Sequence, residues 1–406
     1  MVPSRRWIVL VAGLVALAAG CAVQYGTPFL IPALLADGLS LSQAGLLAGC
    51  PVAGLLVTLL LWGVIADRWG ERLVLTCGLG LGGATLLVGG ATVDGAERGL
   101  TGLAVTLLLA GAATAAVHAA SGRLVLGWFQ PNERGRAMAV RQCAQPLGVA
   151  AAALALPTLA GHGPSAALLA LGGACLFATA LVIAMVRDPR RPDHGGGHRA
   201  GSPYRGPTLW RIHGASSLLV VPQFVIATYS LVFLVDDLGW PPVPAGRLLA
   251  VAQVGGAATR LAAGFWSDRV GSRLGPMRLL AAATGLSLLG LAAASIAGAS
   301  ALAVAALLVC TMLVVSTNGL AFTAVAERAG SAWAGRALGV QNTAQNALAA
   351  ATPPVFGALI GALSFGGGFA VTIAFPVLAG LLVPARTERV VHKFGQRGRA
   401  AAPDQG

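Results

Sequence analysis

The stretch GVIADRWGER, from Gly63 to Arg72, joins two long apolar runs, and a similar stretch joins two later ones. The later copy, GFWSDRVGSR, runs from Gly264 to Arg273, so the copies lie 201 residues apart (264 − 63) in a chain of 406 residues. Two further related stretches begin at Gly135 and Gly335, an offset of 200 (335 − 135). Two pairs at nearly one offset, close to half the chain length, predict a duplicated architecture.

The composition is far from that of a soluble domain. Hydrophobic residues make up 56% of the chain, charged residues 10%, and the mean hydropathy is +0.78. Soluble domains carry roughly 25% charged residues. A net charge of +13 would suggest nucleic-acid binding in a soluble protein, but the basic residues here occur mainly in one set of loops, as at a cytoplasmic membrane face. We therefore expect a membrane protein in contact with the lipid bilayer, and no nucleic-acid partner.

Apolar runs of about 20 residues are long enough to cross the bilayer as helices. We expect an all-α membrane protein with twelve spanning helices in two six-helix halves. The first six spans are 8–35, 43–66, 73–92, 101–126, 137–159 and 165–186. The second six are 209–235, 244–267, 277–298, 301–326, 337–361 and 367–384. The predicted organisation is an N-terminal half (1–186), a linker (187–208), a C-terminal half (209–385) and a basic tail (386–406).

Arginine placement predicts the orientation. Arginines occur in the loops on one side of the predicted bundle, in the linker and in the tail, whereas the opposite loops hold mainly Asp and Glu. The positive-inside rule then places both termini and the linker in the cytoplasm. We expect a multi-pass protein of a bacterial inner or plasma membrane, and a monomer.

The two G-x-x-x-D-R-x-G-x-R loops, one in each half, resemble the loop signature of the major facilitator superfamily, and with the twelve-span layout the resemblance covers nearly the whole chain. It implies two halves that rock around a central site. It also implies that Asp67 meets the start of the helix near Arg336 in the other half, and that Asp268 meets the one near Arg136, where a carboxylate is favourable. These contacts would close the cytoplasmic side. The gating residues expected on this basis are Asp67, Arg68, Arg72, Asp268, Arg269 and Arg273. The alternative is that these residues only anchor the loops.

Motifs for catalysis or metal binding are missing from the sequence. There is no GxSxG, HExxH or CxxC pattern and no phosphate-binding glycine loop followed by lysine. The six cysteines lie in apolar runs without ligand spacing. We expect no enzyme activity, no cofactor and no metal.

The candidate substrate site follows from the polar residues that lie deep in the predicted spans. All 14 acidic residues fall in loops, tails or final helix turns, whereas basic and amide side chains occur farther inside. Guanidinium groups bind carboxylate or phosphate with paired hydrogen bonds, which favours an anion. His118, the only histidine well inside a predicted span, could also carry a proton. The candidate substrate-binding residues are Arg141, Gln145, Arg260, His118, Gln341 and Gln345.

Each of these candidates also has a purely structural explanation. The arginines could extend to the membrane interface, and His118 could be a hydrogen-bonded structural residue. We expect a secondary active transporter of a small solute, an organic anion by preference, with a possible co-transported proton. The alternatives are a proton-driven multidrug or metabolite efflux pump, which the missing deep carboxylate disfavours, and a membrane receptor or scaffold that transports nothing.

Overall fold

The computed structural model describes residues 3–93, 99–130, 133–188, 202–330 and 333–385. Within this described part, every regular element is a helix, and twelve segments are long and apolar enough to cross a membrane. Each predicted span coincides with one of them, which confirms the twelve-span, all-α prediction. The segments are Arg5–Ala36, Leu41–Trp69, Glu71–Thr92, Gly99–Val125, Val140–Ala160, Pro164–Met185, Pro207–Asp237, Pro242–Val270, Leu274–Ile296, Ser300–Ala329, Ala334–Leu363 and Phe365–Leu382.

The internal duplication is visible in helix lengths: α3 and its counterpart α11 are both 29 residues long, and α6 and α14 are both 13. The first half contains α1 (Pro3–Gly26), a short turn (Thr27–Leu30), α2 (Ile31–Ala36), α3 (Leu41–Trp69), α4 (Glu71–Val93), α5 (Gly99–Thr114), α6 (Ala116–Trp128), α7 (Arg134–Gln142), α8 (Ala144–Ala160) and α9 (Pro164–Met185). The second contains α10 (Pro207–Val232), a π-turn (Phe233–Asp237), α11 (Pro242–Val270), α12 (Leu274–Ile296), α13 (Ser300–Val314), α14 (Thr317–Ala329), α15 (Ala334–Leu363), α16 (Phe365–Thr372) and α17 (Ala374–Leu382).

Local sequence explains where several helices begin and end. Ser40 starts α3 with a capping box, in which its hydroxyl accepts from the Gln43 N–H and the Gln43 side chain accepts from the Ser40 N–H. The second glycine of each loop motif ends a helix: Gly70 after α3 has φ +96° and Gly271 after α11 has φ +65°. Side chains other than glycine rarely adopt this conformation. The motif glycines are therefore required by the turn between spans.

Prolines interrupt two of the spans. α7 ends at Gln142, four residues before Pro146, and α16 ends at Thr372, four residues before Pro376. A proline has no N–H to donate to the carbonyl four residues earlier, so one helical hydrogen bond is missing at each of these two breaks. Two other breaks, after α5 and after α13, occur at corresponding places in the two halves without a nearby proline, and we have no physical account of them.

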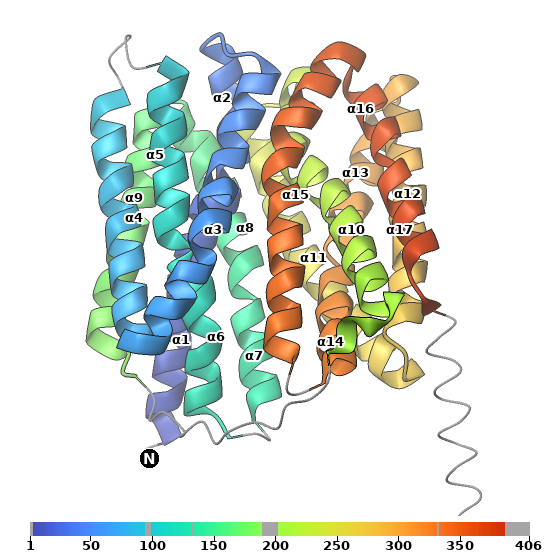
Figure 1. Ribbon diagram of the computed structural model, residues 1–406. Coiled ribbons are helices and arrows are strands. Elements are labelled where there is room, and N and C mark those ends of the chain that lie inside the picture. The colour runs from blue at the N-terminus through green and yellow to red at the C-terminus, as the bar shows by residue number, and fades with distance from the viewer. Residues whose placement is uncertain (1–2, 94–98, 131–132, 189–201, 331–332, 386–406) are drawn as a thin grey trace, which may run out of the picture.

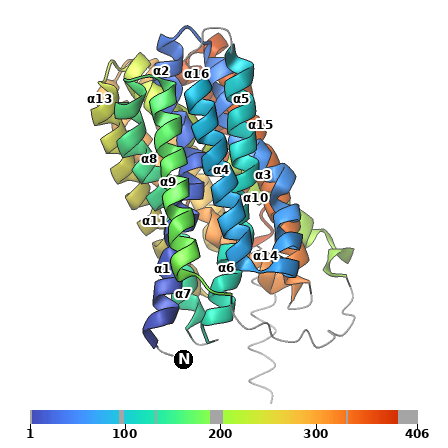
Figure 2. The same cartoon turned by 90° about the vertical axis from the view of Figure 1, so that its left-hand side faces the viewer.

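The third, sixth, ninth and twelfth spans form the two outer edges of the bundle. Figure 1 shows α4 and α9 at one edge and α12, α16 and α17 at the other, and Figure 2 shows α4 and α9 side by side on the outside. Their interiors carry no charged residue, which suits contact with lipid. The charged and amide side chains of the spans are therefore concentrated on the inner helices.

The two halves pack closely at one end of the bundle. The repeated motifs Gly63–Arg72 and Gly264–Arg273 each contain the last turns of a helix, α3 or α11, and the turn that follows it. We call the end with the N-terminus and these two motifs the loop end, at the bottom of Figure 1, and the other the opposite end. Near the opposite end, a Cβ on Gly45 of α3 would lie 2.6 Å from the carbonyl oxygen of Pro353 in α15, and one on Gly246 of α11 would meet the backbone of α8. Glycine allows the helix backbones to approach this closely. The structure thus shows a state closed at the opposite end.

The remaining domain predictions concern the linker and the tail. Only the two ends of the linker are described, where Pro203–Arg205 form a short 3-10 helix and α10 begins at Pro207. Its middle and the tail from residue 386 lie outside the described residues.

Candidate functional site

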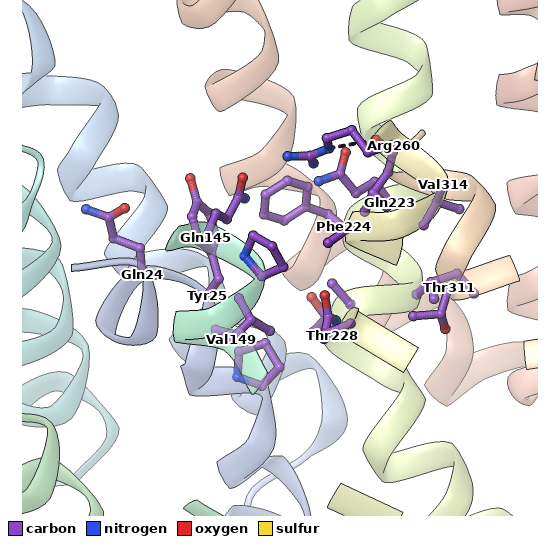
Figure 3. Close-up of a pocket in the computed structure, with 18 residues that line it drawn as sticks. Gln24, Tyr25, Gln145, Val149, Gln223, Phe224, Thr228, Arg260, Thr311 and Val314 are labelled. Carbon is purple, nitrogen blue, oxygen red and sulfur yellow. Dashed lines mark hydrogen bonds between the residues drawn. The ribbon is translucent and has the colours of Figure 1, made fainter. Parts of the chain in front are cut away.

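A central cavity lies between the two halves, with an empty volume of about 760 Å³ that includes the part open to solvent. It is lined by side chains from both halves (Figure 3). Amides, hydroxyls and one guanidinium make up its polar lining, and no carboxylate of the described residues takes part. The polar lining residues are Gln24, Tyr25, Gln145, Gln223, Thr228, Gln253, Arg260 and Thr311.

Arg260 supplies the positive charge of this lining. It lies on α11, and its Nε donates a hydrogen bond to the carbonyl oxygen of Val315 at 3.2 Å. No acidic partner lies within ion-pair distance of it among the described residues. Figure 3 shows its guanidinium pointing into the cavity, toward the side where Gln145 lies. The terminal nitrogens of Arg260 are therefore available to an anion.

Gln24 joins the cavity to His118 through a short hydrogen-bond chain. His118 of α6 donates from Nε2 to the Gln24 side-chain oxygen at 2.7 Å, and the Gln24 amide nitrogen donates to the Thr114 hydroxyl at 3.2 Å. Gln24 is only 1% exposed, whereas His118 is partly exposed. His118 thus lies one residue behind the cavity lining, with its position set by α1.

The second half contains a matching pair. Asn318 of α14 donates from its side-chain nitrogen to the side-chain oxygen of Gln223 at 2.8 Å. Between the two glutamines, Tyr25 and Phe224 meet edge to face across the halves, with ring centroids 5.9 Å apart. The cavity therefore combines an aromatic contact with two glutamines whose oxygens are already occupied.

The other predicted substrate-binding residues lie away from this cavity. Arg141 lines a small, mostly apolar pocket beside α1, and its Nε donates to the Ser121 hydroxyl at 3.0 Å. Gln341 and Gln345 are buried in the second half, and both side chains donate to the Ser216 hydroxyl at 2.6 Å. Of the six candidates, the structure brings Gln145 and Arg260 together in the cavity and connects His118 to it.

His213 is a buried histidine that was not selected from the sequence, because it lies only one turn inside the predicted span 209–235. It is 4% exposed, more buried than His118. Its Nδ1 bonds the Gln341 side-chain oxygen at 2.5 Å and its Nε2 bonds the Tyr204 hydroxyl at 3.1 Å. Burial raises the pKa of Tyr204. This cluster holds the end of the linker to α10 and α15. The sequence signal that could have identified His213 is the group of polar residues on one face of α10.

The loop of the first half is held by ion pairs within that half. Arg123 of α6 binds Asp67 at 2.5 Å and Glu71 at 3.1 Å, and the Glu71 side chain is 6% exposed. The Arg72 backbone N–H donates to Asp188 at 2.7 Å. Sequence spacing could not reveal the central role of Arg123, because its partners lie more than fifty residues away along the chain.

The loop of the second half uses a different arginine. Arg273 binds Asp268 in the same loop and Glu327 at the end of α14, the latter at 3.2 Å. Burial would lower the pKa of Arg273, but its bonds to the two carboxylates raise it overall. Arg68 and Arg269 are exposed. Among the described residues, the ion pairs of Asp67 and Asp268 lie within their own halves. The contacts expected with the opposite half would belong to a state closed at the loop end and stay predictions.

The fold and its central cavity define a polytopic carrier built from two six-helix halves, and comparison with known proteins agrees. The family model of the Major Facilitator Superfamily matches residues 12–353. The chain is 43% identical over 385 residues to proteins described as uncharacterized MFS-type transporters in two strains of Mycobacterium tuberculosis, covering 94% of this chain and 85% of each relative. The chain therefore belongs to the Major Facilitator Superfamily.

Solved structures of similar fold include a bacterial homologue of the human lysosomal transporter Spinster, in an inward-facing and occupied conformation. Its TM-score is 0.78 at 15% identity, over 94% of this chain and 97% of that one. A D-xylose–proton symporter has a TM-score of 0.74 at 17% identity, over 94% of this chain and 99% of that one. At these identities the likeness concerns the fold.

Proposed function

We propose that this transporter carries a small organic anion through the central cavity by alternating access. The observation that carries the proposal is Arg260, a guanidinium in the cavity lining with no carboxylate partner among the described residues. An isolated charge inside a membrane protein is costly, about 2.5–3.5 kcal/mol even on the lenient insertion scale. A cation kept in such a place without a partner is typical of a site whose partner is the solute.

The rest of the lining supports an anion over a cation. The side-chain oxygens of Gln24 and Gln223 already accept hydrogen bonds from α6 and α14. The Gln24 amide nitrogen already donates to Thr114, so the donors left to meet a ligand include the Gln223 amide nitrogen, the terminal nitrogens of Arg260 and the amides of Gln145 and Gln253. A carboxylate accepts such bonds, and the Tyr25–Phe224 pair offers an apolar surface to the rest of a small organic molecule.

The two loops fit the role of gates. In the present state each loop aspartate is bound by an arginine of its own half. We propose that Asp67, Arg68 and Arg72, with Asp268, Arg269 and Arg273, rearrange when the halves close at the loop end. The loop end would face the cytoplasm of a bacterial plasma membrane, with both termini inside and a monomer as the working unit. The arginine-rich loops support this orientation.

The test is a thermal-shift screen of the purified protein in detergent. The ligands are pyruvate, benzoate, succinate and citrate, compared with lipophilic cations and neutral drugs. A ligand that binds the folded state stabilises it by about 2.7 kcal/mol at one hundred times its Kd. We expect a monocarboxylate to raise the Tm and Arg260→Gln to weaken its binding by about tenfold to a hundredfold, the range for a bond to a charged group.

Arg247→Gln is the matched control, because Arg247 lies on the same helix, is exposed and does not line the cavity. It should leave anion binding unchanged. If lipophilic cations stabilise the protein and carboxylates do not, the efflux-pump alternative replaces the anion proposal. Unchanged carboxylate affinity in Arg260→Gln would remove Arg260 from the site.

A further inference from the structure

The chain from Thr114 to His118 fixes the tautomer of the histidine. The Thr114 hydroxyl donates its one hydrogen to the carbonyl oxygen of Ala110 at 2.8 Å, so it accepts from the Gln24 amide nitrogen. The Gln24 oxygen must then face His118, and because that oxygen only accepts, Nε2 of His118 carries a hydrogen. In the neutral ring, Nδ1 is the nitrogen without one.

Nδ1 of His118 is open to a proton. It has no hydrogen-bond partner among the described residues, yet the buried side-chain nitrogens and oxygens that lack a partner in this part of the chain are only those of Arg6 and Ser217. Nδ1 is therefore not among the fully buried atoms without a partner, and the His118 residue is partly exposed. A proton from water can bind there while the Nε2–H bond to Gln24 stays in place and gains strength as a charge-assisted bond.

The other half has the same arrangement without the titratable group. Asn318 follows His118 by 200 residues (318 − 118), and Gln223 follows Gln24 by 199 (223 − 24). Both glutamine oxygens accept from the partner on the fourth or tenth span, at 2.7 and 2.8 Å. Asparagine can thus hold a cavity glutamine as well as histidine can. The histidine in the first half adds one property, a charge that can change.

The surroundings of His118 contain permanent positive charge. Burial of the ring disfavours a positive charge on His118 most strongly, and Arg141 on α7 adds to this effect, whereas Arg123 on α6 is occupied by Asp67 and Glu71. Histidine is the side chain whose unperturbed pKa lets it gain or lose its charge between about pH 5 and 8. The titratable or charged side chains described on α6 and on the helices packed against it are Arg5, Arg6, Cys21, Tyr25, Cys50, Asp67, Arg68, Glu71, Arg72, Cys77, Arg123 and Arg141.

We propose that His118 takes up a proton on Nδ1 when an anion binds in the central cavity, and so links solute binding to protons. The inference rests on the proposed function, since it needs an anion beside Gln24 and Arg260. With the cavity empty, a second positive charge near the arginines is unfavourable. A bound anion offsets that cost, so anion and proton each increase the other's affinity by the same factor. His118 acts through Gln24 and the local charge, as a positioning and coupling residue.

The size of the linkage follows from charge separation. Two unit charges about 10 Å apart at an effective dielectric constant near 20 give a factor of roughly ten in affinity. We therefore expect the anion to bind more tightly near pH 5.5 than near pH 8, by at most about this factor. In the same terms, binding near pH 7 should take up a fraction of one proton per anion.

The experiment uses the full chain in detergent, with pyruvate as the probe because it stays ionised at both pH values, and benzoate as a second anion. Calorimetry in two buffers of different ionisation enthalpy gives the number of protons taken up. The key variant is His118→Asn, which reproduces in the first half the arrangement that Asn318 has in the second. Its side-chain nitrogen can still donate to the Gln24 oxygen. It should bind pyruvate with an affinity that no longer changes with pH and with no proton uptake.

His213→Asn is the matched control, because it removes a buried histidine in the other half that does not line the cavity, and its pH dependence should equal that of the wild type. If His118→Asn keeps the pH dependence, or the wild type shows none while binding pyruvate or benzoate, the linkage is wrong and the anion site stands. If neither these anions nor the wider carboxylate panel binds at either pH, the proposed function itself is wrong and the linkage falls with it.

Discussion

Gly45→Ala tests whether the closed opposite end is held by backbone contact between α3 and α15. A Cβ at this position would lie 2.6 Å from the carbonyl oxygen of Pro353, and it would also meet the hydroxyl of Tyr229. That hydroxyl donates to the same carbonyl oxygen, and Tyr229 is fully buried. Neither atom can move aside easily, so the overlap is relieved mainly by separating the two halves.

The magnitude follows from packing. An inserted methyl group in a close-packed contact costs about 1–3 kcal/mol. The gain in helix propensity from glycine to alanine, about 1 kcal/mol, applies in both conformations and cancels from their ratio. The population should therefore move about fivefold to 150-fold toward the state that is open at the opposite end. Gly361→Ala on α15 is the control, since a Cβ there meets nothing within 4 Å.

The assay is pulsed electron paramagnetic resonance between spin labels at Asp37 and Ala297, exposed positions at the opposite end of the two halves, in a cysteine-free background. We expect Gly45→Ala to add or enlarge a long-distance population, and Gly361→Ala to match the parent protein. A Gly45→Ala distance distribution that equals the parent's would refute the argument that this glycine permits the closed state.

Three further substitutions separate stability from transport. Arg123→Gln leaves the buried Glu71 carboxylate without its partner, so thermal or chemical unfolding should show a loss of about 1–3 kcal/mol; an unchanged unfolding midpoint would contradict this. Asp67→Asn, at an exposed carboxylate, should slow pyruvate or benzoate flux into proteoliposomes while calorimetric affinity stays within a few-fold; lost binding would argue against a gate. Gln341→Ala removes one of the donors to Ser216 and should lower the Tm, with anion affinity retained as the check that it lies outside the site.

Much of the fold was predictable because two of its signals can be read directly from the amino-acid sequence. Membrane helices need about 20 apolar residues, so the spans could be counted, and the repeated loop fixed their division into two halves. The end of α3 also has a local signal, because Gly70 adopts a backbone conformation that excludes most residues. These features depend on neighbours along the sequence, which is why they were accessible without the structure.

The cavity was only partly predictable. Arg260 and Gln145 were selected because they are polar and deep, whereas Gln341 and Gln345, selected for the same reason, face Ser216 in the packed second half. Depth along a helix can be counted from its ends, but the direction of a side chain around the helix cannot. In a soluble helix the apolar stripe gives that direction; a membrane helix is apolar toward lipid and toward protein alike.

The duplication also shows where function departs from symmetry. Each half supplies a glutamine to the cavity and holds it from the neighbouring helix, by His118 in one half and Asn318 in the other. Arg260 likewise has no cationic equivalent, since residue 59 at the same offset is a leucine. The permanent charge thus comes from the second half and the changeable charge from the first. Under the proposed function, an anion bound between them would be attracted by both, so its departure would weaken the hold on the proton. A symmetric pair of asparagines would bind the same solute without that dependence, which is why His118→Asn separates binding from coupling.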